Sequence, residues 1–195
     1  MIAITLHIFY IEDWDFFREK LEKLNINFDL YISLTDGNKD ISDLIFKSFP
    51  LAKIFTFPNV GADITPFLHI FNLIRNEDYD YLIKLHTKSI KSTCHEKWKK
   101  AGRWRALLVD CLIGSDEVVN SNINVLKTKK FAMCGSKRWH KIQKWKMRYE
   151  PWEARTVYEF IGGTMFMVDF KKYIKRNSTK EKINPGGVKF FCGGK

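Results

Sequence analysis

The fold is decided by residues 53–89, KIFTFPNVGADITPFLHIFNLIRNEDYDYLIKLHTKS. The first five residues form a short apolar run of the strand type, and residues 79–85 form another. Between these runs, Thr65-Pro66 begins a helical pattern, and proline suits the first helical position because its missing N–H would have no partner there. The stretch therefore predicts a strand, a helix and a second strand.

The preceding residues repeat this alternation. Residues 3–10 read as a strand, and Asp13 is placed to cap a helix with apolar residues at helical spacing. Residues 28–34 read as the next strand and are closed by a turn signal at residues 36–38, after which Asp40 is placed to cap a short helix. Four strands alternating with helices through short connections predict an α/β fold, a doubly wound, mostly parallel sheet flanked by helices.

The second half continues with mixed elements. Residues 103–114 have a helical pattern, and Ser115 is a good cap for a second helix because acidic residues follow it. Residues 131–135 and 160–168 read as strands. We predict a single domain over residues 1–170, followed by a basic, glycine-rich tail at 171–195 that is poorly ordered or truncated.

Composition narrows the class of protein. A chain of 195 residues suffices for one domain with a substantial core. It contains no apolar stretch of the roughly 20 residues that cross a bilayer, and the apolar start lacks the basic region and cleavage site of a signal peptide. The four cysteines are scattered, so we expect neither a zinc site nor a disulfide framework. A cytoplasmic protein is the simplest expectation.

Charge is divided unevenly along the chain. Residues 1–80 contain 7 Lys and Arg against 13 Asp and Glu, whereas residues 81–195 contain 26 against 9. This asymmetry favours an anionic partner for the second half, such as phosphates, nucleic acid or a lipid surface. A solvated lysine-rich surface explains scattered lysines equally well.

Two polar segments follow predicted strands. Ligands of open parallel sheets bind beyond the carboxyl ends of the strands, near the point where the strand order reverses. In the first segment, residues 58–66, Gly61 permits close backbone approach, and Asn59 and Asp63 can hydrogen-bond a ribose or a base edge. The helix N-terminus that follows favours an anion. The alternative is a plain turn whose polar side chains satisfy backbone amides.

The second segment comes at the end of the fourth predicted strand. Lys84, His86 and Lys88 alternate, so they lie on one face of an extended chain. Together with Ser89 and neighbouring hydroxyls they suit a phosphate or diphosphate, because lysine supplies charge and hydroxyls supply directed hydrogen bonds. A plain strand exit into solvent is the alternative.

The ordered motifs resemble a known family. They comprise Asn59-x-Gly61-x-Asp63-x-x-Pro66-Phe67, Tyr79-Asp80-Tyr81, Lys84-Leu85-His86-Thr87-Lys88-x-x-x-Ser92, Trp104-Arg105 and Gly163-Thr164-Met165-Phe166. Across roughly residues 4–168 the chain resembles the rhamnan synthesis protein F family, which is implicated in bacterial surface polysaccharide assembly and regarded as similar to glycosyltransferases of the GT-A fold.

The resemblance implies a glycosyltransferase. Its donor would be a nucleotide sugar, carrying rhamnose or another deoxysugar, and its acceptor a growing, often lipid-linked, polysaccharide or lipopolysaccharide glycan. The donor site would then include Asn59, Gly61, Asp63, Lys84, His86, Lys88 and Ser89. The acceptor side would include Trp104, Arg105, Gly163 and Thr164.

One departure from the GT-A pattern concerns the metal. These enzymes carry an Asp-x-Asp at the end of the fourth strand, where the carboxylates hold a divalent ion on the diphosphate. Here that place reads Lys84-Leu85-His86-Thr87-Lys88, and Asp78-x-Asp80 lies at the start of the strand. We therefore expect no cofactor and a diphosphate neutralised by cationic side chains. A Mg²⁺ or Mn²⁺ requirement is the alternative.

The catalytic base is not placed by the sequence. Sugar transfer with inversion needs a base to deprotonate the acceptor hydroxyl, and the candidates Glu153 and Glu159 fit surface charges better. A catalytically degenerate protein that binds a nucleotide sugar or glycan as an assembly partner is therefore the main alternative. A nucleic-acid-binding protein is the less favoured one, because no nucleic-acid module is recognisable.

Residues 136–156 form a basic insertion that also contains tryptophans. Aromatic and cationic side chains together suit the headgroup region of an anionic membrane, and aromatic rings also stack on sugars. We expect peripheral association with the inner face of the plasma membrane. Packing of the tryptophans on the core is the alternative.

Overall fold

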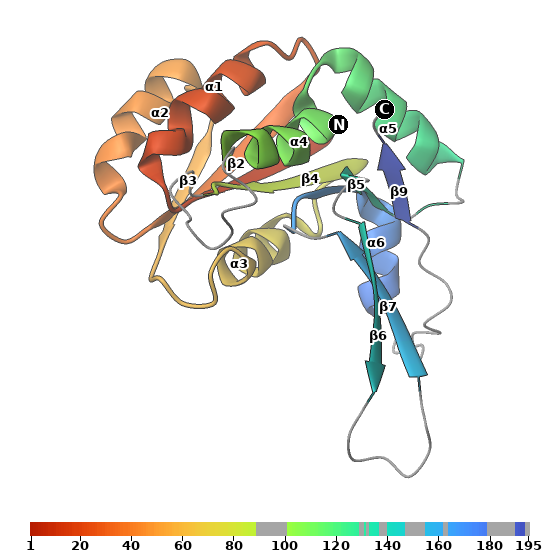
Figure 1. Ribbon diagram of the computed structural model, residues 1–195. Coiled ribbons are helices and arrows are strands. Elements are labelled where there is room, and N and C mark those ends of the chain that lie inside the picture. The colour runs from red at the N-terminus through yellow and green to blue at the C-terminus, as the bar shows by residue number, and fades with distance from the viewer. Residues whose placement is uncertain are drawn as a thin grey trace.

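The computed structural model (Figure 1) describes residues 1–88, 101–128, 131, 133–136, 140–146, 155–161, 164–178 and 190–193. The strands are β1 Ile2–Ile8, β2 Phe28–Thr35, β3 Lys53–Phe57, β4 Tyr81–His86, β5 Met133–Ser136, β6 His140–Lys146, β7 Arg155–Ile161, β8 Phe166–Asp169 and β9 Phe190–Gly193. The helices are α1 Trp14–Glu22, α2 Ser42–Ser48, α3 Ile64–Ile74, α4 Ala101–Ile113, α5 Asp116–Lys127 and α6 Phe170–Ser178, with 3-10 turns at Ile11–Asp13 and Lys39–Ile41.

The main sheet has the strand order β3-β2-β1-β4-β8-β5-β9. β1 pairs in parallel with both β2 and β4, β2 pairs in parallel with β3, and β5 pairs in parallel with β9. β8 runs antiparallel to its neighbours β4 and β5. The sheet is thus mixed, because the chain enters β8 at the edge where β4 ends and must run back along it. The predicted α/β class is confirmed, whereas the sheet is mixed, with parallel pairing among β1, β2, β3 and β4 and antiparallel pairing at β8. The GT-A-like character of the fold stays a prediction.

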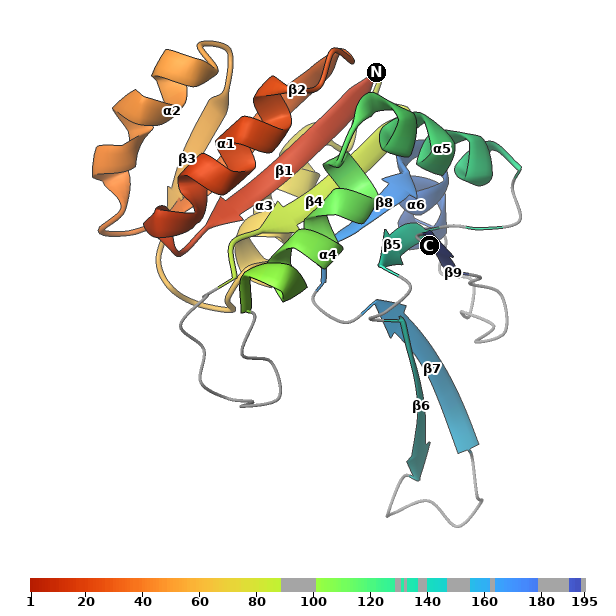
Figure 2. The ribbon, with the colours of Figure 1, turned by 45° about the horizontal axis from the view of Figure 1, so that its top comes forward.

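Helices cover both faces of this sheet, as a doubly wound fold requires (Figures 1 and 2). Side chains of α1, α2, α4 and α5 pack with alternate residues of β1, such as Ile4 and Leu6, on one face. On the other face α3 and α6 pack with Ala3 and Leu82. The period-2 alternation of the strands therefore assigns Thr5, which follows Ala3 by two residues, to the α3 face.

Several predicted helix starts are wrong in detail. α3 begins at Ile64, two residues before Pro66, and proline is tolerated there because the first four N–H groups of a helix have no partner within it. Asp40 lies inside a 3-10 turn, and α2 begins at Ser42. The Asp13 carboxylate is used in long-range contacts described below. The Ser115 cap of α5 is confirmed, since its Oγ accepts from the Val118 N–H at 3.4 Å.

The second half differs from expectation at two places. The strand predicted at residues 160–168 is split into β7 and β8, and Thr164 between them adopts a left-handed conformation with a φ of 54°. The basic insertion contributes β6, which pairs with β7 as an antiparallel hairpin. This hairpin projects away from the main sheet (Figure 2).

The tail predicted after residue 170 contains α6 at its start and β9 near its end. β9 extends the main sheet beside β5. In the described ranges, no helix has the length and apolar character needed to cross a membrane.

Candidate functional site

The carboxyl ends of β1 and β4 meet at the point where the strand order reverses. From β1 the chain builds β2 and β3 on one side, then returns to add β4 on the other side of β1. His7 and His86, near the ends of these two strands, are register partners. This is the edge at which open α/β sheets bind their ligands.

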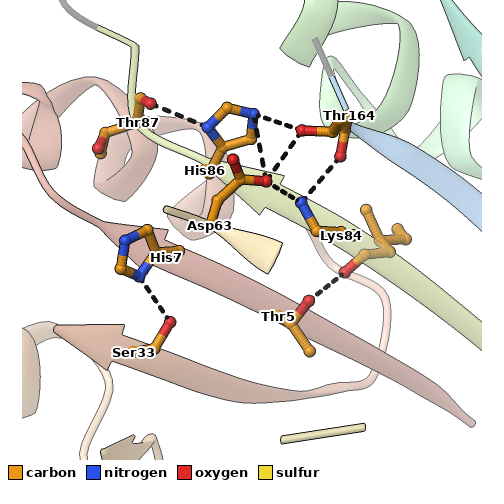
Figure 3. A network of polar contacts seen from close by, with 9 residues as sticks. Thr5, His7, Ser33, Asp63, Lys84, His86, Thr87 and Thr164 are labelled. Carbon is orange, nitrogen blue, oxygen red and sulfur yellow. Dashed lines mark hydrogen bonds and ion pairs between the residues drawn. The ribbon is translucent and has the colours of Figure 1, made fainter. Parts of the chain in front are cut away.

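Asp63 and Lys84 form the centre of a polar cluster at this edge (Figure 3). The Lys84 ammonium donates to Asp63 Oδ2 in an ion pair whose side chains are 1% and 15% exposed. Thr164 joins both residues: its Oγ1 lies 2.9 Å from Asp63 Oδ2, and its carbonyl oxygen accepts from Lys84 Nζ at 3.0 Å. The cluster thereby connects the start of α3, the end of β4 and the segment that enters β8.

Left-handed backbone positions these side chains. Gly61 has a φ of 73°, Ala62 of 51° and Thr164 of 54°. For a β-branched residue such as Thr164 this conformation is rare and strained, and such strain gathers at functional sites. Gly61 is further restricted because a Cβ there would lie 1.9 Å from Thr65 Oγ1.

The charges of the cluster depend on one another. Burial alone would raise the pKa of Asp63, but the neighbouring His86 and Lys84 side chains, with hydrogen bonds from Lys84 and Thr164, lower it to about 2. Burial lowers the pKa of Lys84, against the opposing effect of Asp63. The Lys84 ammonium also lies 5.4 Å from the ring centroid of Phe67, a distance at which a cation is attracted to an aromatic face.

Two buried histidines flank the ion pair. His86 Nδ1 lies 3.1 Å from the Thr87 carbonyl oxygen, and its Nε2 lies 3.1 Å from Thr164 Oγ1 and 3.9 Å from Asp63 Oδ2. His7 Nδ1 lies 3.0 Å from Ser33 Oγ. Burial lowers the pKa of His7, so this ring is neutral at pH 7.

Thr87 fastens the ends of β1 and β4 together. Its Oγ1 accepts hydrogen bonds from the backbone N–H groups of Phe9 and Tyr10, each at 3.0 Å. Its own N–H donates to the His7 carbonyl at 2.9 Å. The next residue, Lys88, is half-buried and its pKa is lowered by that burial.

Asp13 holds the backbone of Lys88 from the other side of the sheet. Its fully buried carboxylate accepts from the Lys88 N–H at 3.0 Å and pairs with the Arg105 guanidinium. That guanidinium lies 4.0 Å from the ring centroid of Phe16. The Asp13 side chain was predicted to cap α1, but it joins α1, α4 and the segment after β4.

The predicted site residues are only partly brought together. Asp63, Lys84 and His86 share one cluster, and Gly61 forms the turn that leads into it. Asn59 is exposed in the same turn, and Lys88 follows β4. Thr164, predicted on the acceptor side, lies in the cluster with Asp63, whereas Arg105 pairs with Asp13.

For three of the predicted site residues, the position of the side chain relative to the cluster cannot be given. Ser89 and Gly163 lie outside the described residues, and Trp104 belongs to α4 but its side chain is outside them too. The donor and acceptor roles of the whole set stay predictions.

Sequence reasoning missed three residues of this region. His7 and Ser33 were treated only as strand residues, and Asp13 as a cap. The rule about carboxyl ends of parallel strands was applied to the third and fourth strands alone. Applied to residues 3–10 as well, it would have pointed to His7.

The sequence model that describes the rhamnan synthesis protein F family matches residues 1–192 of this chain. Among curated proteins, the chain is similar to the uncharacterized protein WxcX from two strains of Xanthomonas campestris pv. campestris, with 27% and 26% identity over 170 residues. These residues are 86% of this chain and 22% of each relative. The chain thus spans about a fifth of the length of these relatives.

Proposed function

This chain belongs to the rhamnan synthesis protein F family, and from that membership we propose that it is a glycosyltransferase of the GT-A type. The family name supports a role in polysaccharide synthesis. In this proposal it transfers a sugar, rhamnose or another deoxysugar, from a nucleotide-sugar donor to a growing surface polysaccharide or lipopolysaccharide glycan.

The main observation in support of a donor site is the cationic cluster at the carboxyl ends of β1 and β4, where the strand order of the sheet reverses. Among the described residues of this cluster, the lysines are Lys84 and Lys88 and the carboxylate is Asp63, before any charge on His86 is counted. A positive site at the carboxyl edge of a parallel sheet favours the diphosphate of a nucleotide sugar. Asn59, in the turn that leads to Asp63, is exposed and available to the ribose or the base.

A divalent metal fits this cluster poorly. Asp63 Oδ2 already accepts from Lys84 and from Thr164, and two cationic groups beside it would repel a divalent ion. Among the described residues, no group of three His, Cys, Asp or Glu side chains is arranged to hold a metal. We propose that Lys88 and the neighbouring cations supply the charge that neutralises the leaving diphosphate.

Membrane association is proposed from the β6–β7 hairpin. The hairpin projects from the main sheet (Figure 1), and its strands contain Lys141, Lys144, Lys146 and Arg155 as well as Trp145. Such a segment suits an anionic lipid surface, where a lipid-linked acceptor would lie. Sedimentation with vesicles of anionic or neutral lipid tests this, and equal binding to both would contradict it.

Donor binding is tested by thermal shift and calorimetry with UDP-sugars and dTDP-sugars. We expect saturable stabilisation that survives EDTA and is weakened in Lys88→Ala. Lys47→Ala removes the same charge from the exposed part of α2 and is the matched control. Failure of every nucleotide to stabilise the wild type would overturn the donor site, and a strict Mg²⁺ requirement would overturn the metal-free mechanism.

Turnover is tested separately from binding. Incubation with a stabilising nucleotide sugar and glycan acceptors should release the nucleoside diphosphate. Binding without sugar transfer would identify a non-catalytic member that serves assembly by holding the donor.

A further inference from the structure

The hydrogen bonds of His86 determine which of its nitrogens carry protons. Nδ1 lies 3.1 Å from the Thr87 carbonyl oxygen, and a carbonyl oxygen can only accept. Nδ1 therefore carries a proton and donates it. This leaves the state of Nε2 to be decided by Thr164.

Thr164 has one hydroxyl proton for two contacts. Its Oγ1 lies 2.9 Å from Asp63 Oδ2 and 3.1 Å from His86 Nε2 (Figure 3). The Lys84 ammonium pairs with Asp63 Oδ2, so the Asp63 carboxylate is ionised and can only accept. The Thr164 proton must point to Asp63, and Nε2 must then donate to Thr164 Oγ1.

A neutral His86 would leave one of these contacts without a proton. If Nε2 accepted the Thr164 proton, Thr164 Oγ1 and Asp63 Oδ2 would face each other as two acceptors 2.9 Å apart. An unsatisfied buried polar group is costly. The negative charge of Asp63, 3.9 Å from Nε2, adds to the preference for a protonated ring.

We propose that His86 is held as a doubly protonated imidazolium at neutral pH, with Thr164 as its positioning residue, and that this charge helps to bind a diphosphate. The choice of ligand rests on the proposed function, whereas the protonation of His86 rests on the geometry alone. With His86 charged, the described residues beside Asp63 include three cationic side chains, Lys84, His86 and Lys88, and several cations in one site suit the charge of a diphosphate.

The charged groups around His86 come from several elements. Asp63 at the start of α3 favours the imidazolium, whereas Lys84 of β4 and Lys88 beyond it oppose it. His7 of β1 is neutral because burial lowers its pKa. Asp13, which holds the Lys88 backbone, is paired with a guanidinium.

Nitrogen NMR of the imidazole rings tests the protonation directly. At about pH 7.5 an ordinary histidine is roughly nine-tenths neutral. We expect both nitrogens of His86 to be protonated in the wild type, and the neutral form to appear in Thr164→Val, which removes the hydroxyl but keeps the shape. Thr164→Ser, which keeps the hydroxyl, should restore the imidazolium. A neutral His86 in the wild type would overturn the proposal.

Calorimetry with inorganic pyrophosphate tests whether the positive charge of His86 contributes to the binding of a diphosphate. We expect His86→Asn and Thr164→Val to weaken binding roughly tenfold, and Thr164→Ser to bind like the wild type. Binding by Thr164→Val equal to the wild type would overturn the binding role of His86. If pyrophosphate binds as expected but no nucleotide sugar does, the proposed function fails while the protonated anion site stands.

Discussion

Asp63 and Lys84 form a buried ion pair that joins the start of α3 to the end of β4. Residues 21 positions apart in sequence are brought together because α3 packs on the face of the sheet that Lys84 shares. Without Asp63, the buried ammonium group of Lys84 would be a positive charge without compensation in the protein interior, which is strongly unfavourable. The pair therefore has a structural role as well as the proposed role in the site.

Removal of either partner should destabilise the protein more than removal of both. Asp63→Asn leaves the buried Lys84 without its carboxylate partner, and Lys84→Met leaves Asp63 without the cation that donates to it. Each variant should lower the free energy of unfolding by about 3 kcal/mol in urea titrations. The double variant should lose less than the sum. Glu22→Gln, in the more exposed Arg18–Glu22 pair, is the control and should lose under about 1 kcal/mol. Additive losses at Asp63 and Lys84 would contradict the pairing.

The same carboxylate should make stability depend on acidic pH. The folded-state pKa of Asp63 is lowered from 3.8 to about 2. Its contribution to stability is therefore fully present above pH 4 and is lost as the pH falls from about 3.8 towards 2. The contribution is about 2 kcal/mol. The difference between unfolding curves of the wild type and Asp63→Asn, measured across this window, should shrink as the pH falls. A constant difference would show that Asp63 keeps an ordinary pKa.

Much of the fold follows from local pattern. Alternating apolar runs and helical spacing locate the first four strands and their helices, since each element must bury one face. Asp13 shows where this reasoning stops. Its position before a helix indicates a cap, but its partners Lys88 and Arg105 are distant in sequence, and no local rule reveals them. The left-handed Thr164 between β7 and β8 was missed for a similar reason, because its partner Asp63 is distant in sequence.

The site was predictable to the extent that it follows strand ends. Lys84 and His86 were placed on one face correctly by alternation, and they lie on the α3 face with Asp63. The sequence could not show that Lys84 is compensated internally by Asp63. That pairing depends on the three-dimensional approach of the turn around Gly61 to β4.

Thr87 should contribute more to stability than an ordinary strand threonine. Thr87→Val keeps the shape but removes the acceptor for the N–H groups of Phe9 and Tyr10. We expect a loss of about 2 kcal/mol in chemical denaturation, because two partly buried donors lose their partner. Thr56→Val, on the exposed side of β3, should change stability by less than about 0.5 kcal/mol. Equal effects at the two positions would contradict the role of Thr87 in joining β1 to β4.

Arg105 should be needed mainly to compensate Asp13. Burial raises the pKa of Asp13, with the Lys88 N–H and the Arg105 charge opposing the shift. Arg105→Met would leave the buried carboxylate without its cation and should cost about 3 kcal/mol at pH 7. The cost should fall as the pH is lowered and Asp13 takes up a proton. Asp13→Asn in the same background should recover part of the loss. A pH-independent cost would indicate lost packing on Phe16.

Alanine substitutions at two glycines should distinguish the cost of backbone strain from the cost of a steric clash. Gly37 and Gly61 both have positive φ values, 94° and 73°, so alanine is strained at either position. A Cβ at Gly37 meets nothing within 4 Å, whereas at Gly61 it would lie 1.9 Å from Thr65 Oγ1 and 2.9 Å from Thr65 Cβ. Gly37→Ala should therefore lose about 1 kcal/mol, and Gly61→Ala about 3 kcal/mol in urea titrations.

Gly61→Ala should also disturb the site, because the turn at Gly61 and Ala62 delivers Asp63 to Lys84 and Thr164. We expect it to weaken nucleotide-sugar binding under conditions where the variant remains folded, and Gly37→Ala to leave binding unchanged. A displaced turn would also change the ring nitrogen signals of His86, which lies against Thr164. Equal loss of stability in both variants, with binding intact, would show that the turn at Gly61 is adaptable and that Asp63 is positioned by its partners instead.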